Sequence, residues 1–146
     1  MVFWQLTINA QDPARLARFW AEALGFSPAP PATPDTPWNR HYRSRLGDRT
    51  AFEDRIFDPE GLRPPIWFQP TSEAAPGPNR LHLDLYPTER DASLPQPRLV
   101  EIVDTRVAEL VALGASVDHR VSSDDPEDPY YWVVMHDPEG NEFCVS

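Results

Sequence analysis

The feature that most constrains the fold of this chain is an internal repeat. The turn Asp-Pro-Glu-Gly occurs at 58–61 and again at 137–140, so its two copies start 79 residues apart. Each copy follows an alternating strand pattern and an amphipathic helix pattern in the same order. A four-residue turn alone can recur by chance, but a strand and a helix in step with it indicate a duplicated strand–helix–strand–strand–strand unit.

The leading segments of the two halves, 3–10 and 80–86, alternate between apolar and polar residues, which predicts strands with two different faces. Each precedes a predicted helix. The first helix should start at Pro13 with Asp12 as its N-cap and end at Gly25. The second should end at 113–114. Its expected buried stripe consists of Ile102, Val103, Val107, Leu110 and Val111.

The other elements are shorter. The proline-rich segment 28–38 predicts an irregular loop. Weak patterns predict strands over 41–46 and 50–57. Clearer ones predict strands over 66–69, 116–121, 130–136 and 141–145. We expect Asp58 and Asp137 to accept hydrogen bonds from amides of the two Asp-Pro-Glu-Gly turns.

Length and composition indicate one α+β domain over 1–146, made of repeats at about 1–70 and 79–146. With 23 acidic and 13 basic residues the net charge is −10, which disfavours nucleic acid and anionic membranes as partners. The single cysteine excludes an internal disulfide, and no apolar run has the length of a membrane span. We therefore expect a cytoplasmic protein.

The polar faces of the predicted strands carry hydrogen-bonding and aromatic side chains, a composition typical of a ligand-binding wall. A strand face that only contacts solvent would be expected to carry residues such as Lys, Glu and Ser instead. Alternation places the following residues on these polar faces: Phe3, Gln5, Thr7, Asn9, Trp67, Gln69, Arg80, His82, Asp84, Tyr86, Glu142 and Cys144. A curved sheet lined in this way makes a cleft.

The segments 6–13, 18–26, 79–85 and 132–145 resemble the vicinal oxygen chelate superfamily. This superfamily includes glyoxalase I, extradiol dioxygenases, fosfomycin-resistance enzymes and bleomycin-binding proteins, and the chain is most similar to its glyoxalase-like branch. The resemblance implies two βαβββ modules that form an open, U-shaped mixed sheet around a cavity, with the helices on the outer face. It also implies a homodimer that binds a small molecule.

Four positions of that family carry metal ligands, and the resemblance places them at Gln5, Gln69, His82 and Cys144. The family has Glu where this chain has Gln69 and Cys144. Because hard divalent ions need anionic oxygen ligands, we expect no metal cofactor, and extradiol dioxygenase or ordinary glyoxalase activity is disfavoured. A zinc-like ion held by Cys144 and His82 remains the alternative.

Two functions follow from these residues. The first is a metal-independent lyase, isomerase or hydrolase in which His82 is the acid/base and Gln5, Arg80 and Gln69 orient an oxygenated substrate. The second is a non-catalytic protein that sequesters an aromatic metabolite or antibiotic. The expected ligand-binding residues are Gln5, Thr7, Trp67, Gln69, Arg80, Asp84, Tyr86 and Cys144. His82 could equally be a structural partner of Asp84 or Arg80, and Cys144 a small buried apolar residue.

Overall fold

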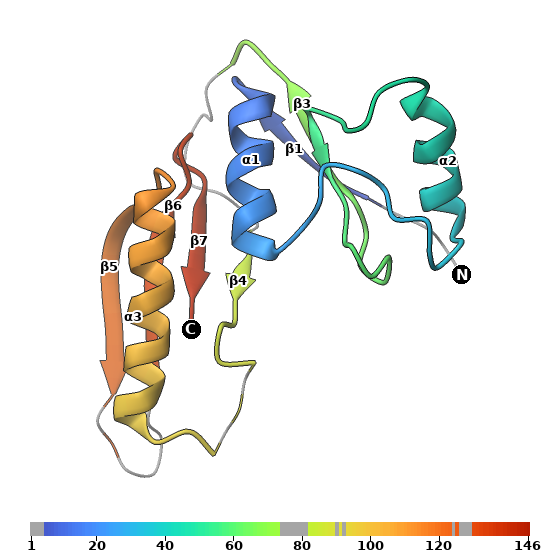
Figure 1. Cartoon of the computed structure of the whole chain (residues 1–146). Coiled ribbons are helices and arrows are strands. Elements are labelled where there is room, and N and C mark those ends of the chain that lie inside the picture. The colour runs from blue at the N-terminus through green and yellow to red at the C-terminus, as the bar shows by residue number, and fades with distance from the viewer. Residues whose placement is uncertain (1–4, 74–81, 90, 92, 124, 126–129) are drawn as a thin grey trace. The chain divides into compact units, whose positions relative to one another are not determined.

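The computed structural model describes residues 5–73, 82–89, 91, 93–123, 125 and 130–146. The chain divides into two compact units, 1–74 and 75–146 (Figure 1). In the described residues three helices and two mixed sheets, neither of them closed, form an α+β fold. None of the helices in these ranges has the length and apolar character that crossing a membrane requires.

The first unit contains a three-stranded sheet in the order β1-β3-β2. Its elements are β1 (Leu6–Ala10), α1 (Pro13–Leu24), α2 (Pro37–Leu46), β2 (Arg55–Ile56) and β3 (Ile66–Pro70). β1 runs parallel to β3, and β2 is antiparallel to β3. Because α1 connects the parallel strands β1 and β3 over one face of the sheet, its apolar stripe becomes the core of this unit.

The predicted first helix is confirmed at both ends. The Asp12 carboxylate accepts a hydrogen bond of 3.0 Å from the backbone N–H of Arg15, and Pro13 is the first helical residue. Gly25 ends the helix with φ of 68°, a left-handed conformation that glycine adopts without strain. Between these ends Leu16 and Trp20 are almost fully buried.

The second unit contains a four-stranded sheet in the order β4-β7-β6-β5, with α3 packed on one face. Its elements are β4 (Asp84–Leu85), α3 (Gln96–Ala112), β5 (Ser116–Ser123), β6 (Tyr130–His136) and β7 (Glu142–Val145). The predicted helix and the strands over 116–121, 130–136 and 141–145 are confirmed. Of the strand predicted over 80–86, residues 80 and 81 lie outside the described part of the chain, and only Asp84–Leu85 of the rest forms a strand. The prediction that Val111 is buried is wrong. Val103, Val107 and Leu110 lie on one face of the helix, whereas Val111 is turned about 100° away and is 46% exposed.

The structure corrects the expected strands over 41–46 and 50–57. The first of these segments is helical and belongs to α2, and only Arg55–Ile56 of the second forms a strand. Thr36 caps α2 by accepting from the N–H of Asn39, and Pro37 is its first residue. The helix start at Thr36 and Pro37 and the helical spacing of Trp38 and Tyr42 therefore outweigh the weak alternation behind the strand prediction.

In chain order, α2 therefore lies between α1 and β2, where the second unit has the strand β5 between α3 and β6. One residue pair of the lost strand persists, because Ser27 forms an isolated antiparallel bridge with Phe57. The matching pair in the second unit is Ser116 and His136. In each pair the second residue directly precedes the Asp-Pro-Glu-Gly turn, so the two units share this bridge, whereas the strand that continues from Ser116 to Ser123 has no counterpart after Ser27.

Both turns are held as predicted by the carboxylate of their first residue. Asp58 accepts from the N–H groups of Glu60, Leu62 and Arg63. Asp137 accepts from the N–H groups of Glu139 and Asn141. Both carboxylates are buried, so their role is to satisfy turn amides.

Candidate functional site

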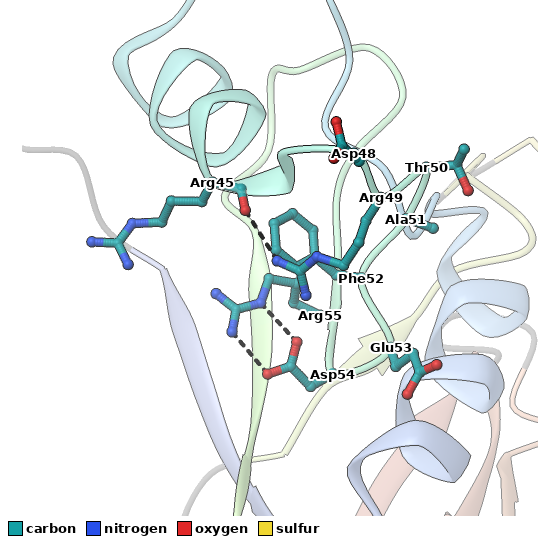
Figure 2. Close-up of a pocket in the computed structure, with 9 residues that line it drawn as sticks. All are labelled: Arg45, Asp48, Arg49, Thr50, Ala51, Phe52, Glu53, Asp54 and Arg55. Carbon is teal, nitrogen blue, oxygen red and sulfur yellow. Dashed lines mark hydrogen bonds and ion pairs between the residues drawn. The ribbon is translucent and has the colours of Figure 1, made fainter.

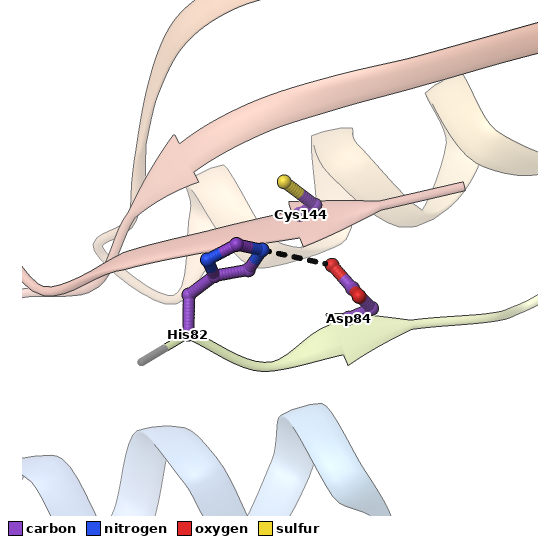
Figure 3. Close-up of side chains that lie close together, drawn as sticks. All are labelled: His82, Asp84 and Cys144. Carbon is purple, nitrogen blue, oxygen red and sulfur yellow. Dashed lines mark ion pairs between the residues drawn. The ribbon is translucent and has the colours of Figure 1, made fainter. Parts of the chain in front are cut away.

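Three chemically active side chains meet in the second unit. Asp84 of β4 lies opposite Cys144 of β7 in the parallel register, so both side chains leave the sheet on the same face. His82 precedes Asp84 by two residues and shares that face. Its Nε2 atom lies 3.3 Å from Oδ1 of Asp84, and one donor atom from each of the three residues falls within 4.8 Å of the others (Figure 3).

The carboxylate of Asp84 is the centre of this cluster. It faces the His82 imidazole, and the parallel register places Cys144 opposite it on the neighbouring strand. Burial, followed by the negative charges of Asp84 and Glu142, raises the pKa of Cys144. Since a thiol reacts as its thiolate, these neighbours make Cys144 a poor nucleophile and leave His82 and Asp84 as the groups suited to proton transfer.

The cluster borders a hollow of about 280 Å³ in the second unit. Its lining residues are His82, Asp84, Tyr86, Trp132, Cys144 and Ser146. The side chains of His82 and Asp84 are 41% and 45% exposed, so both are accessible to a ligand. Trp132 forms an aromatic wall, and its ring is stacked on Tyr130 with centroids 4.8 Å apart.

Sequence reasoning identified four of these lining residues and missed two. The predicted His82, Asp84, Tyr86 and Cys144 lie together, whereas Trp132 and Ser146 were not expected there. The antiparallel pairing of Val134 with Cys144 puts Trp132 and Ser146 on the same face, because Trp132 lies two residues before Val134 and Ser146 two residues after Cys144. Alternation along 130–136 and 142–146 could have revealed them if the strand register were known.

The predicted ligand-binding residues of the first unit lie on the sheet face opposite α1. Register pairs Thr7 with Trp67 and Asn9 with Gln69, and Thr7, Asn9 and Gln69 are exposed. Arg80 and Phe3 lie outside the described residues.

Helix α2 contacts the polar side of this sheet, an arrangement that the sequence did not predict (Figure 1). The buried Tyr42 of α2 donates a hydrogen bond from its hydroxyl to Oε1 of Gln5. The Arg55 guanidinium lies 5.1 Å from the centre of the Tyr42 ring. Gln5 is therefore tied into the packing of its own unit through its amide oxygen.

Trp67 is held by the same group of side chains. Its indole N–H donates to Asp54 over 3.0 Å, and Asp54 forms two hydrogen bonds with Arg55. The Arg55 guanidinium also lies 5.4 Å from the Trp67 ring centre. The hydrogen bond from Arg55, stronger than the opposing effect of burial, lowers the pKa of Asp54, so this ion pair persists at neutral pH. Trp67 thus has a fixed ring position with a cation beside it.

A second hollow, of about 910 Å³, lies in the first unit between α2 and β2 (Figure 2). It is lined by Arg45, Asp48, Arg49, Thr50, Ala51, Phe52, Glu53, Asp54 and Arg55. Its three arginines are balanced by three acidic residues. Arg49 donates to backbone carbonyls at the end of α2, and Arg55 pairs with Asp54. Because Arg49 and Arg55 are engaged and its lining contains no His or Cys, this hollow is a poorer candidate site than the one at His82.

A sequence profile described as a glyoxalase-like domain matches residues 5–146. The chain belongs to this glyoxalase-like family. Through it the chain is a member of the vicinal oxygen chelate superfamily, which confirms the resemblance seen in the sequence. No curated protein matches this chain significantly.

Several solved structures share the fold. A glyoxalase/bleomycin resistance protein/dioxygenase family enzyme from Burkholderia phytofirmans PsJN has a TM-score of 0.56 at 17% identity, over 97% of this chain and 94% of that one. A glyoxalase/bleomycin resistance protein from Albidiferax ferrireducens T118 has a TM-score of 0.50 at 16% identity, over 98% and 96%. The fosfomycin resistance protein FosX from Listeria monocytogenes has a TM-score of 0.52 at 12% identity, over 99% and 91%. At these identities the likeness shows the fold alone.

The four ligand positions of the superfamily do not suit a hard divalent ion in this chain. Gln5 and Gln69 offer neutral amides, and the Gln5 oxygen already accepts the Tyr42 hydroxyl. These two residues lie in the first unit and His82 and Cys144 in the second, so their convergence stays a prediction. Asp84, which is not one of the four positions, adds an anionic oxygen beside His82 and Cys144.

Proposed function

We propose that this protein is a metal-independent enzyme of the lyase or isomerase type that moves a proton on a small oxygenated or aromatic metabolite. The observation that carries the proposal is the contact of 3.3 Å between His82 Nε2 and Asp84 Oδ1 at the edge of a hollow. A histidine oriented by a carboxylate and open to a ligand is the arrangement that general acid–base catalysis needs.

The contact assigns a role to each atom of the pair. A carboxylate can only accept, so the Nε2 atom that faces Asp84 carries the proton of a neutral imidazole. The lone pair is then on Nδ1, which takes a proton from the substrate and returns it. Asp84 holds the ring in this tautomer and stabilises the imidazolium that forms.

The rest of the hollow suits a small planar or carbonyl-containing ligand. Trp132 offers an aromatic surface, and Tyr86 and Ser146 add hydroxyl groups. A volume of about 280 Å³ is small for a ligand site, so we expect a compact metabolite.

The test is solvent deuterium exchange, because proton removal from carbon can be detected before the product is known. A panel of 2-oxo acids, α-hydroxy ketones and aryl ketones is incubated with protein in deuterium oxide and followed by proton NMR. We expect exchange in at least one compound and a loss of about 100-fold or more in His82→Gln. The matched control is His119→Gln, because His119 forms the other His–Asp contact of the second unit, with Asp118. Equal exchange in wild type and His82→Gln would refute the proposal.

Sequestration of an aromatic ligand is the second candidate, and the stacked pair Tyr130 and Trp132 beside the hollow favours it. A thermal-shift screen separates the two functions. Binding that is lost in Trp132→Ala but kept in His82→Gln, with no exchange in any compound, would support a binding protein.

We also propose, from the family resemblance, that the protein is a cytoplasmic homodimer. Light scattering coupled to size exclusion tests the oligomeric state, with twice the mass of one chain as the expected result. Fractionation of expressing cells tests the location.

A further inference from the structure

We propose that His82, Asp84 and Cys144 form a site for a thiophilic divalent cation of the zinc type, contained in the second unit, and that its occupancy blocks proton transfer by His82. The binding part stands on the geometry of the cluster alone. The blocking part rests on the proposed function and extends it to regulation of the same site.

The distances in the cluster approach those of a metal centre. Zinc–ligand bonds of about 2.0–2.3 Å in tetrahedral geometry place neighbouring ligand atoms roughly 3.4–3.6 Å apart. The nitrogen of His82 and the oxygen of Asp84 are already 3.3 Å apart, and all three donor atoms lie within 4.8 Å of one another. The three donor atoms thus need only a side-chain adjustment of about 1 Å to reach the spacing of a zinc site, and all three side chains stand on adjoining segments of one sheet (Figure 3).

The chemistry of the donors selects the ion. One imidazole nitrogen, one carboxylate oxygen and one thiol sulfur suit Zn²⁺ or Co²⁺, whereas Mg²⁺ and Ca²⁺ prefer oxygen ligands throughout. As the ion binds, the thiol proton passes to the buffer and a metal–thiolate bond forms. Since the side chains of His82 and Asp84 are nearly half exposed, an ion can enter and a fourth position stays open to water.

The site differs from the superfamily's in that it needs nothing from the first unit. Asp84 supplies the anionic oxygen that Gln5 and Gln69 lack. Because Tyr42 holds the Gln5 oxygen, we expect substitution of Gln5 to leave the affinity for the ion unchanged.

Occupancy would disable His82 through its tautomer. An ion on Nε2 displaces the proton from that nitrogen, so the neutral ring carries its proton on Nδ1 instead. The Nδ1 lone pair that accepts the substrate proton in the proposed reaction is then lost. The same side chain therefore serves in proton transfer or in metal binding, and never in both at once.

The binding test is a titration of chelator-treated full-length protein with Co²⁺, followed by absorption spectroscopy. A cobalt–thiolate bond produces a charge-transfer band in the near ultraviolet, and d–d bands report tetrahedral geometry. We expect both in wild type at one ion per chain, with no band in Cys144→Ser. Asp84→Asn should weaken binding by at least about tenfold, the loss that even outer-shell partners of metal ligands produce.

Two matched controls make the result specific. Asp118→Asn removes a carboxylate beside another imidazole of the unit, that of His119, and should bind Co²⁺ as wild type does. Gln5→Ala should do the same. The absence of a thiolate band in wild type, or equal affinity in wild type and Asp84→Asn, would overturn the site. Loss of Co²⁺ binding in Gln5→Ala would contradict the claim that the site needs no residue of the first unit. Circular dichroism of each variant verifies that it is folded.

The blocking test uses Zn²⁺ in the deuterium-exchange assay. Stoichiometric Zn²⁺ should abolish exchange, a chelator should restore it, and Mg²⁺ should have no effect. Undiminished exchange in zinc-loaded protein would contradict the blocking role. If no compound exchanges in metal-free protein but Co²⁺ still binds, the proposed function fails while the metal site stands.

Discussion

Replacing Asp58 by asparagine is expected to destabilise the first unit far more than the same change at Asp137 destabilises the second. Both carboxylates are buried in identical Asp-Pro-Glu-Gly turns. At Asp58 the backbone donors are divided between the two oxygens. Oδ1 accepts from Glu60, and Oδ2 accepts from Leu62 and Arg63. Whichever way an asparagine amide is turned, its NH₂ group therefore faces at least one backbone N–H.

Asp137 is arranged differently, because its Oδ1 atom alone accepts both backbone donors, from Glu139 and Asn141. An asparagine there keeps both bonds and changes the contact of Oδ2 with the Asn141 side chain. A hydrogen bond to a charged group contributes about 1.5–3 kcal/mol, so we expect a loss of about 2 kcal/mol for Asp58→Asn. For Asp137→Asn we expect less than about 1 kcal/mol.

The cost at Asp58 should depend on pH. Burial alone would raise the pKa of Asp58, but hydrogen bonds from Arg63 and from the N–H of Glu60 outweigh it and lower the pKa below 3.8. A carboxyl whose pKa is lowered by folding stabilises the folded state above its unfolded pKa and loses that contribution as pH falls through the folded pKa. The gap between wild type and Asp58→Asn should thus be constant at neutral pH and close below about pH 4.

The assay is urea unfolding of the full chain, with separate transitions fitted where the two units unfold independently. Arg63→Ala serves as a comparison, because it removes the side-chain hydrogen bonds to both Asp58 oxygens and leaves every backbone hydrogen bond to the carboxylate in place. Equal losses in Asp58→Asn and Asp137→Asn, or a gap that does not narrow as the pH falls below about 4, would refute the reasoning.

Three further predictions concern packing and thiol chemistry. Tyr42→Phe should cost about 1 kcal/mol in urea unfolding, because the ring keeps its packing and only the hydrogen bond to Gln5 is lost; a loss above about 3 kcal/mol would contradict this. Phe68→Ala should lower the free energy of unfolding by about 3–5 kcal/mol, since Phe68 is fully buried in β3; a loss below about 1 kcal/mol would contradict this and mean that neighbouring residues fill the cavity left by the ring. Cys144 should react slowly with iodoacetamide at neutral pH and faster in Asp84→Asn, because burial first and Asp84 next raise its pKa; an unchanged rate would argue against the contact.

The elements with strong local signals could be predicted from the sequence. The run of aromatic and β-branched residues in 130–136 and the capping residues Asp12, Pro13 and Gly25 each favour a local conformation without help from distant residues. The segment 41–46 lacks such alternation. Its helix is stabilised by contacts of Tyr42 with Phe52 and Phe57, which lie well outside the segment and which a local pattern does not contain.

The candidate site was predicted only in part for the same reason. His82 and Asp84 lie two residues apart on one strand, so their common face follows from alternation alone. The contact of Asp84 with Cys144 depends on the register between β4 and β7, which are separated by the whole of α3, β5 and β6. Trp132 requires the register between β6 and β7 as well. The sequence therefore indicated which residues carry the chemistry but not which of them meet.

The most direct test of the central claim, that His82 and Asp84 act as one proton-transfer unit, is a double-mutant cycle on the deuterium-exchange rate. Rates are measured for wild type, His82→Gln, Asp84→Asn and the double variant with the compound that exchanges fastest. If Asp84 acts only through the imidazole, the double variant should be no slower than His82→Gln. Losses that multiply in the double variant would contradict this account, because they would mean that the two residues act independently.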